Sequence, residues 1–247
     1  MCSIAPLCMG RKDDVVLWSC VEGNMGRVWV DDKDNPESAI ALVADFCYLL
    51  GCLKESINTA LIKELLNNCR SKVIIADDIS WISFIEKNYQ NSFRRFNRYA
   101  IKKEPNIFIR EQLNDYIWAV EPYEVVRIDE SLYYKSLEDN FMADFCCYFS
   151  DLQDFLMNGI GYVVLHKGEI IAGASSYSYC KDSIEITIGT KKDFRRKGLA
   201  TACAAKLIVE CIDRNIYPRW EAVNLESVAL AEKLGYNFEN EFTVYSI

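Results

Sequence analysis

Hydrophobic and polar positions along the C-terminal half of the chain predict strands and helices in a clear order. Two apolar runs, residues 161–166 and 169–179, flank Lys167-Gly168, which predicts two antiparallel strands joined by a tight turn. A third strand is expected over residues 182–190, and the helix-like spacing after it covers residues 198–213. The other elements expected here are strands over residues 123–127 and 217–223, and helices over residues 130–137, 140–148, 151–157 and from Asn224 to Gly235.

The N-terminal half mixes strand-like and helix-like patterns. Residues 26–30 predict a strand, and residues 37–50 carry apolar positions at helical spacing up to Gly51. Asn35 suits the N-cap of that helix and Pro36 its first position, so a helix is predicted over residues 37–50. The remaining elements expected here are helices over residues 56–69 and 80–89, a buried strand over residues 72–76 and a strand over residues 93–99.

A change of pattern near residue 118 divides the chain into two predicted domains. Residues 102–121 mix charges with short apolar groups and include Pro105, as expected of a connection between domains. We therefore predict an α/β (α+β) protein, with a smaller N-terminal α/β domain of residues 1–118 and a C-terminal domain of residues 119–247.

Composition excludes several classes of function. The 28 basic and 36 acidic side chains give a net charge of 28 − 36 = −8, which argues against nucleic-acid binding. The arginines between aromatic residues at 93–99 fit the solvent-exposed face of a strand. No run is long and apolar enough to span a membrane, and Met1 to Gly10 does not read as a secretory signal. The 11 cysteines, an odd number without a C-x-x-C pair, fit buried thiols in a reducing compartment, so we expect a cytoplasmic protein.

Few residues suit metal or nucleophilic chemistry. The single histidine, His166, stands at a predicted strand end and reads as a turn residue, so a Ser-His-Asp triad or a His-containing zinc site is not expected. The acidic residues at 31–37 lack the spacing and central glycine of a calcium loop. We therefore predict no metal site.

The strongest chemical signal is a basic turn between the strand over 182–190 and the helix that follows. Arg195, Arg196 and Lys197 supply three positive charges, and Gly198 lets the backbone approach a ligand closely. The first N–H groups of a helix have no internal partner, and the helix dipole favours an anion there. The pattern therefore predicts a phosphate-binding site in the C-terminal half.

The spacing Arg195-x-x-Gly198-x-Ala200 resembles the acyl-CoA pyrophosphate loop of the GNAT superfamily of N-acetyltransferases. The segment from Asn224 to Tyr236 is similar to the last core helix of that superfamily and its closing Gly-aromatic pair. The resemblance implies a GNAT core with a mixed, splayed central sheet, which binds acetyl-CoA between the strands at 182–190 and 217–223. It implies these cofactor-binding residues: Ile188, Gly189, Thr190, Arg195, Arg196, Lys197, Gly198, Leu199, Ala200, Thr201 and Asn224.

For catalysis the resemblance implies Glu185 as the base that takes a proton from the acceptor amine; the alternative is an exposed charge or a structural ion pair. Many members of the superfamily carry a tyrosine, as the acid for the thiolate, at the position of Ala231. Tyr236, Tyr245, Tyr177 or water could replace it, or no acid is needed.

A narrower resemblance covers nearly the whole chain and is to a bacterial GNAT subfamily that includes zwittermicin A resistance-type acetyltransferases. It is carried by residues 26–32, 35–36, 45–47, 184–186, 195–201 and 230–236. The implied function is acetyl transfer from acetyl-CoA, in a ternary complex, to a primary amine of a small molecule such as an aminopolyol antibiotic. The N-terminal domain would form part of the acceptor pocket or the surface of a homodimer. The alternatives are a CoA-binding sensor with little catalysis and an acetyltransferase of protein amines.

Overall fold

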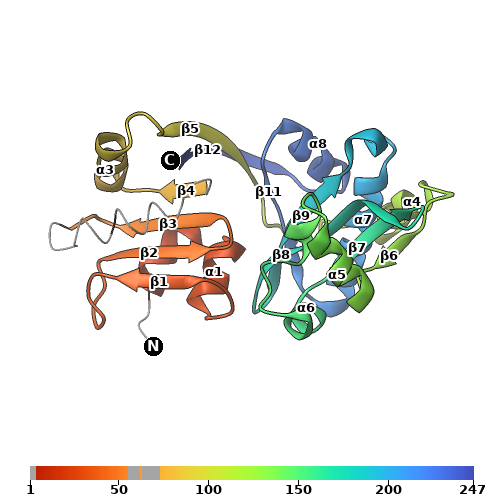
Figure 1. The fold of residues 1–247 in the computed structure, drawn as a ribbon, viewed down its shortest axis with the longest axis horizontal. Coiled ribbons are helices and arrows are strands. Elements are labelled where there is room, and N and C mark those ends of the chain that lie inside the picture. The colour runs from red at the N-terminus through yellow and green to blue at the C-terminus, as the bar shows by residue number, and fades with distance from the viewer. Residues whose placement is uncertain (1–3, 55–61, 63–72) are drawn as a thin grey trace. The chain divides into compact units, whose positions relative to one another are not determined.

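The computed structural model describes residues 4–54, 62 and 73–247 and divides the chain into two compact units (Figure 1). The first unit spans residues 1–98 and includes the C-terminal residues 241–247, and the second spans residues 99–240. The boundary therefore falls at 98/99, where 118/119 was predicted. Residues 110–118, which we expected to lie before the boundary, form helix α4 of the second unit.

The second unit is built on a five-stranded sheet with the order β10-β9-β8-β7-β6. The strands from β6 to β9 pair antiparallel, and β9 and β10 pair parallel, so the sheet is mixed as predicted. The strands are β6 (Val125–Arg127), β7 (Gly161–His166), β8 (Glu169–Cys180), β9 (Ser183–Thr190) and β10 (Tyr217–Arg219). The helices are α4 (Arg110–Trp118), α5 (Glu130–Glu138), α6 (Leu152–Asn158), α7 (Leu199–Arg214) and α8 (Leu225–Lys233), with 3-10 turns η2 (Ala143–Phe145) and η3 (Lys192–Phe194).

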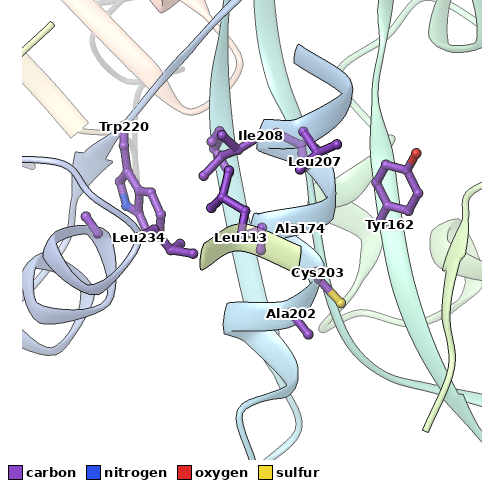
Figure 2. Packing of buried hydrophobic residues seen from close by; sticks show 14 of the residues in the cluster. Leu113, Tyr162, Ala174, Ala202, Cys203, Leu207, Ile208, Trp220 and Leu234 are labelled. Atoms are coloured by element: carbon purple, nitrogen blue, oxygen red, sulfur yellow. The ribbon is translucent and has the colours of Figure 1, made fainter. Parts of the chain in front are cut away.

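Helix α7 is the centre of the larger core in this unit. Most of its side chains are buried, and small residues such as Ala202 and Cys203 let it lie close to the sheet. Figure 2 shows Leu207 and Ile208 of α7 gathered with Ala174 of β8 and with Leu113, which α4 contributes. Each leucine or isoleucine side chain of this group stabilises the fold by roughly 1.5–3 kcal/mol when fully buried. The start of α7, which bears the predicted phosphate site, is therefore fixed by a well-packed helix.

The sheet splays where β9 and β10 separate. The two strands pair at only three positions, of which Glu185 and Arg219 are the last. Trp220 separates β10 from β11 (Glu221–Ala222), and β11 pairs with residues 99–100 at the end of β5 (Arg94–Ile101). The single strand predicted over 217–223 is therefore two strands that join different sheets, and the predicted splayed sheet is confirmed.

The first unit also contains a mixed sheet, in which β1-β2-β3-β4-β12-β5 are consecutive neighbours. Its strands are β1 (Arg27–Val30), β2 (Ser38–Val43), β3 (Phe46–Gly51), β4 (Val73–Ala76), β5 and β12 (Phe238–Ser246), and the described helices are η1 (Ala5–Arg11), α1 (Val15–Val21) and α3 (Ile79–Asn88). The elements predicted over 26–30, 72–76, 80–89 and 93–99 are confirmed. The helix predicted over 56–69 lies outside the described residues.

The prediction of a helix over residues 37–50 is wrong, because this segment forms the β2–β3 hairpin. Both strands are buried on both faces, so the apolar run has no strand alternation, and periodicity does not separate it from a helix. The chain reverses at Ala44, which has φ +52°, and Asp45. Asn35 caps no helix; its N–H instead donates to the Asp32 carboxylate at 2.8 Å, in a turn before β2.

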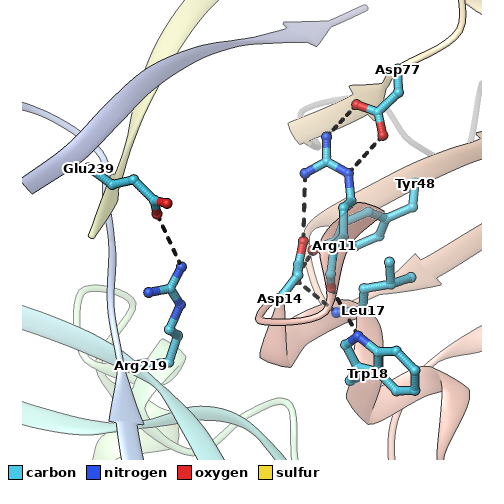
Figure 3. A network of polar contacts seen from close by, with 8 residues as sticks. All are labelled: Arg11, Asp14, Leu17, Trp18, Tyr48, Asp77, Arg219 and Glu239. Carbon is cyan, nitrogen blue, oxygen red and sulfur yellow. Dashed lines mark hydrogen bonds and ion pairs between the residues drawn. The ribbon is translucent and has the colours of Figure 1, made fainter. Parts of the chain in front are cut away.

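A polar network ties η1 and α1 to the strands of the first unit (Figure 3). The Arg11 guanidinium binds both carboxylate oxygens of Asp77, at 2.6 and 3.0 Å, just after β4. Asp14 caps α1 by accepting from Leu17 N at 3.0 Å, and it also accepts from the Tyr48 hydroxyl at 2.9 Å. These contacts position the N-terminal segment by charge-assisted hydrogen bonds.

The other predictions for the second unit are mostly confirmed. The β7–β8 hairpin, α5, α6, α7 and α8 lie where they were expected, but residues 140–148 form only turns and the short η2, not a helix. No helix in the described part of the chain is long and apolar enough to cross a membrane. Within the same residues, no three His, Cys, Asp or Glu side chains gather as metal ligands would.

Candidate functional site

The basic loop predicted from the sequence connects β9 to α7 in the second unit. After β9 ends at Thr190, the η3 turn leads to Arg195, Arg196 and Lys197, whose side chains are all exposed. Arg196 has φ +59° and Gly198 φ +79°, so the chain turns twice through left-handed conformations just before α7. A glycine at 198 avoids the strain that other residues incur there.

The N-terminus of α7 has free donors and no competing negative charge. Its N-cap is Gly198, which has no side chain to bond the first-turn N–H groups, and the first turn contains no acidic residue. The amides of Leu199, Ala200 and Thr201 belong to that turn, and the first intrahelical bond is made by Ala202 N to Gly198 O at 3.0 Å. A Cβ on Gly198 would meet only Val120 Cγ1, at 3.6 Å, so the space around it is open.

The strand before this loop exposes one backbone edge. Lys191 N donates to Ile171 O at 2.8 Å. Because hydrogen-bonded and non-hydrogen-bonded pairs alternate along antiparallel strands, the N–H and C=O groups of the odd-numbered β9 residues point toward β8. Tyr217 N donates to Asp182 O at 2.8 Å, so the even-numbered residues face the β10 side. The last β9–β10 pair is at Glu185. Beyond it, Ile188 presents its N–H and C=O groups at the splayed edge, and Thr190 presents its N–H group, while its C=O accepts from Arg195 Nε at 3.3 Å; Gly189 does not face this edge.

Two further observations show how the end of β9 is packed. The Thr190 hydroxyl oxygen is buried and has no hydrogen-bond partner within the described residues. Gly189 lies beneath the ring of Phe141, whose Cε1 would be 3.3 Å from a Cβ at that position. The Lys191 ammonium binds Asp139 at 2.6 Å and holds the pKa of that carboxyl below its usual value, so the segment after α5 is held against the end of β9.

Glu185 lies where the two strands of the wedge separate. The residue is 7% exposed, and its Oε1 accepts from Glu221 N at 2.6 Å. The hydrogen bond joins β9 to the start of β11. Both interpretations of Glu185, proton acceptor and structural brace, are compatible with this position.

The residues named around α8 have separate roles. Asn224 is the N-cap of α8, because its Oδ1 accepts from Ser227 N at 2.8 Å, and its side-chain NH₂ group is not part of that bond. Ala231 is fully buried in α8. Tyr236 is buried between Phe108 and Trp220, its hydroxyl donates to Pro218 O at 2.6 Å, and burial raises its pKa well above the usual value. Tyr236 is therefore a structural residue.

The other candidate acids lie apart from the basic loop in the chain. Tyr177 belongs to β8, where it pairs with the ring of Tyr148 at a centroid distance of 4.7 Å. Tyr245 belongs to β12 of the first unit and stacks on Phe93. The thiols of Cys203 and Cys211 are buried, and burial raises the pKa of both, as expected for packing rather than reactive cysteines.

A row of aromatic rings flanks the basic loop and was missed from the sequence. The Tyr123 and His166 rings lie 6.0 Å apart, the His166 and Phe194 rings 5.3 Å apart, and the Lys197 ammonium lies 4.9 Å from the Phe194 ring centre. His166 therefore has a packing role beside the loop, beyond the turn role predicted for it. The only sequence signal was the aromatic character of three segments far apart in the chain.

Comparison with known proteins identifies the family. A family model of GNAT acetyltransferases matches residues 5–245. The chain belongs to the GNAT acetyltransferase family. The enzyme is 36% identical to a GCN5-related N-acetyltransferase-like protein from Streptococcus suis 89/1591, with a TM-score of 0.88 over 98% of this chain and 96% of that chain.

One curated protein and one further solved structure are more distantly similar. The enzyme is 23% identical over 227 residues to the uncharacterized N-acetyltransferase YdfB of Bacillus subtilis (strain 168), which covers 89% of this chain and 85% of YdfB. A GCN5-related N-acetyltransferase from Kribbella flavida shares the fold, with a TM-score of 0.55 and 13% identity over 92% of this chain and 91% of that chain. The predicted class of enzyme is thus confirmed, and acetyl-CoA is the usual co-substrate of this family.

Proposed function

We propose that the enzyme transfers an acetyl group from acetyl-CoA to a primary amine of a small molecule in a ternary complex. The observation that carries the proposal is the uncapped N-terminus of α7, which is joined to the open edge of β9 by the η3 turn and the basic loop. The donors suit a pyrophosphate, because backbone N–H groups, the helix dipole and nearby cations all favour an anion. The buried Thr190 hydroxyl, which has no partner among the described residues, also fits a site that is completed by a polar ligand.

The loop and the strand edge would hold different parts of the co-substrate. The amides of Leu199, Ala200 and Thr201 would bind the pyrophosphate, with Arg195, Arg196 and Lys197 adding positive charge. The Ile188 C=O group and the Thr190 N–H group would pair with the amides of the pantetheine arm, as an added strand does. Gly189 would contribute its lack of a side chain instead, because Phe141 lies over it. The Asn224 NH₂ group would donate to the co-substrate while its Oδ1 caps α8.

The reaction needs an oxyanion donor and a group that removes a proton from the amine. Bound acetyl-CoA supplies an activated thioester. The N–H group of Ile188, at the open edge of β9, would donate to the developing oxyanion. Glu185 would accept the proton from the acceptor amine directly or through a water, from its position where β9 and β10 separate. Holding the amine and thioester together contributes up to about 7–11 kcal/mol without any further side chain.

The variant Glu185→Gln separates the two interpretations of this residue. A glutamine keeps a side-chain carbonyl that accepts from Glu221 N but has no basicity, so the brace between β9 and β11 is preserved. We expect kcat to fall about 100-fold, within the range of general base catalysis, and the acidic limb of the pH–rate profile to disappear. The matched control is Glu169→Gln, at the exposed start of β8, which should leave the profile unchanged. An unaltered profile in the folded variant would make Glu185 a brace only.

We propose the class of acceptor from the net charge of the chain and from its resemblance to a subfamily of acetyltransferases. A chain with net charge −8 attracts cationic amines, and the resemblance to zwittermicin A resistance-type enzymes favours an aminopolyol or a similar antibiotic. The roles predicted for the N-terminal part of the chain, acceptor binding or homodimer formation, stay predictions.

Calorimetric titration with acetyl-CoA, followed by a screen of small amines, tests this function. Mass spectrometry should detect a product that is one acetyl group heavier than the amine, which avoids interference from the 11 cysteines of the protein. Binding with an acetylated amine would establish the reaction. Binding without any product across polyamines, aminosugars and aminopolyols would contradict a small-molecule acceptor, and no binding would overturn the assignment of the loop.

A further inference from the structure

We propose that the ring of Phe141 covers the pantetheine arm of acetyl-CoA where the arm approaches the thioester. The inference rests on the proposed function, because it takes the arm to lie beside the open edge of β9 at Ile188 and Thr190. It assigns a contact with the co-substrate to the segment that connects α5 to η2.

Two facing glycines make room for aromatic rings on one face of the sheet. Gly173 of β8 pairs with Gly189 of β9. A Cβ on Gly173 would overlap the ring of Phe145. A Cβ on Gly189 would lie 3.3 Å from Cε1 of Phe141 and 3.6 Å from Cζ of Phe145. Both rings therefore rest on the backbone of this glycine pair, and both reach Gly189.

The two rings lie on the face of β9 that α7 does not cover. Side chains alternate between the two faces of a strand, so the Cβ position of Gly189 shares its face with Glu185. The even-numbered Ile184 and Ile186 point the other way, into the core around α7. Phe141 therefore lies on the same face of the sheet as the proposed base, which is the face from which an acceptor can reach the thioester.

The exposed surface of Phe141 lies beside the open edge of β9. Phe145 is 2% exposed and occupies the side toward β8, whereas Phe141 is 46% exposed. Toward the wedge, β9 has no partner at this level among the described strands, because its pairing with β10 ends at Glu185. A ring over Gly189 therefore borders the edge along which the arm is proposed to run.

Polar contacts fix the segment that carries this ring. The Asp139 carboxylate accepts from Phe141 N at 2.9 Å, and its other oxygen binds the Lys191 ammonium at 2.6 Å. Lys191 directly follows the last residue of β9, so one carboxylate ties the backbone of Phe141 to the end of that strand. A ring held in this way needs little rearrangement to meet a ligand, which limits the entropy lost on binding.

The pantetheine arm offers apolar groups that suit an aromatic ring. A chain that pairs with Ile188 C=O and Thr190 N–H lies in the plane of the sheet, about 4.8 Å from β9, so its methylene groups project toward both faces. On the face away from α7 these groups would meet the exposed surface of Phe141. Covering about half of that surface would strengthen binding roughly five- to tenfold, because it removes apolar area from water.

The test compares Phe141→Ala and Phe141→Leu with the wild-type enzyme against three probes. Acetyl-CoA and acetyl-pantetheine 4′-phosphate contain the arm, whereas adenosine 3′-phosphate 5′-diphosphate has the pyrophosphate without it. Affinities are measured by calorimetry, by competition with acetyl-CoA where binding is weak. The control is Tyr134→Ala, which removes an aromatic side chain that is 52% exposed on α5 of the same unit. Thermal unfolding of each variant shows that it is folded.

We expect Phe141→Ala to weaken both arm-containing probes by the same factor, at least about fivefold. The affinity for the nucleotide probe should stay within about twofold of the wild-type value, because that probe does not reach the ring. Phe141→Leu keeps an apolar side chain over Gly189 and should retain most of the affinity. Tyr134→Ala should bind all three probes as the wild type does.

The outcomes separate this inference from the function on which it rests. Unchanged acetyl-CoA affinity in folded Phe141→Ala would overturn the contact and leave the acetyltransferase function intact. Weakening of all three probes, or of acetyl-CoA alone, would also overturn it, because the substitution would then act on the fold or on nucleotide binding. A change of oligomeric state without a change of affinity would assign the ring to an interface between copies instead. Failure of the wild type to bind acetyl-CoA would overturn the proposed function itself.

Discussion

A negative charge at the N-terminus of α7 should abolish acetyl-CoA binding. In Gly198→Asp a carboxylate replaces a hydrogen at the N-cap, where the first-turn amides of α7 would otherwise bind the pyrophosphate. Two unit charges about 4 Å apart interact by about 4 kcal/mol at the effective dielectric constant of a protein surface, a factor of about 1,000 in affinity. Salt and solvent screen an exposed loop, so we expect a loss of at least about 100-fold.

Backbone strain must be separated from this electrostatic effect. Gly198 has φ +79°, and a side chain in that conformation costs about 1–2 kcal/mol of folding stability whether or not ligand is bound. Gly168, in the β7–β8 turn, has φ +82°, and a Cβ there would meet nothing within 4 Å, so Gly168→Asp has the same strain and charge without a helix N-terminus. Gly198→Ala keeps the strain at the site and adds no charge; its Cβ would be 3.6 Å from Val120, an ordinary contact.

Calorimetric titration with acetyl-CoA at low and at moderate salt, with thermal unfolding of every variant, measures both effects. Gly198→Asp should show no measurable heat of binding, Gly198→Ala a loss below about tenfold, and Gly168→Asp the wild-type affinity, since only the first places charge on the phosphate. The melting temperatures of the three variants should fall by similar amounts. A folded Gly198→Asp that binds acetyl-CoA within about threefold of the wild type would refute the assignment of this loop.

Two further predictions test the supporting residues. Tyr236→Phe should lower the free energy of unfolding by about 1–3 kcal/mol, because the Pro218 carbonyl loses the hydroxyl that donates to it at 2.6 Å. The value of kcat should stay near that of the wild type. A large loss of kcat at unchanged stability would instead make Tyr236 the acid. The pKa of Asp139 is lowered by its hydrogen bond to Lys191, so this pair stabilises the fold above the unfolded carboxyl pKa and stops doing so as pH falls through the lower folded value. The difference in melting temperature between the wild type and Asp139→Asn should therefore be largest near neutral pH and shrink in acid; a difference that is constant with pH would exclude the ion pair as its source.

Local patterns in the sequence were sufficient wherever neighbours along the chain make the structure. The β7–β8 hairpin follows from two apolar runs around Lys167-Gly168, and the start of α8 follows from Asn224, which caps it. The placement of Gly198 before α7 follows from the same kind of local rule, and it was enough to propose an anion site. Family resemblance added the mixed, splayed arrangement of the sheet in the second unit.

Tertiary structure alone decided the features that depend on distant partners. Residues 37–50 form two strands because both of their faces are covered, and burial on both faces removes the alternation by which a strand is recognised. Residues 217–223 divide between two sheets because the partners of β10 and β11 are β9 and the end of β5, which lie far from them in sequence. The return of residues 241–247 to the first unit likewise depends on pairing between Tyr245 and Ile74.

The candidate site divides in the same way. The sequence by itself determined the basic loop and the helix that follows it, because these are consecutive in the chain. Only the tertiary structure showed which backbone groups of β9 face the open edge, that Glu185 is bound by the Glu221 amide, and that Val120 lies beside Gly198. Hydrogen-bond direction and packing between distant segments follow from the register of strands and the angle of helices, and no local pattern of residue types contains them.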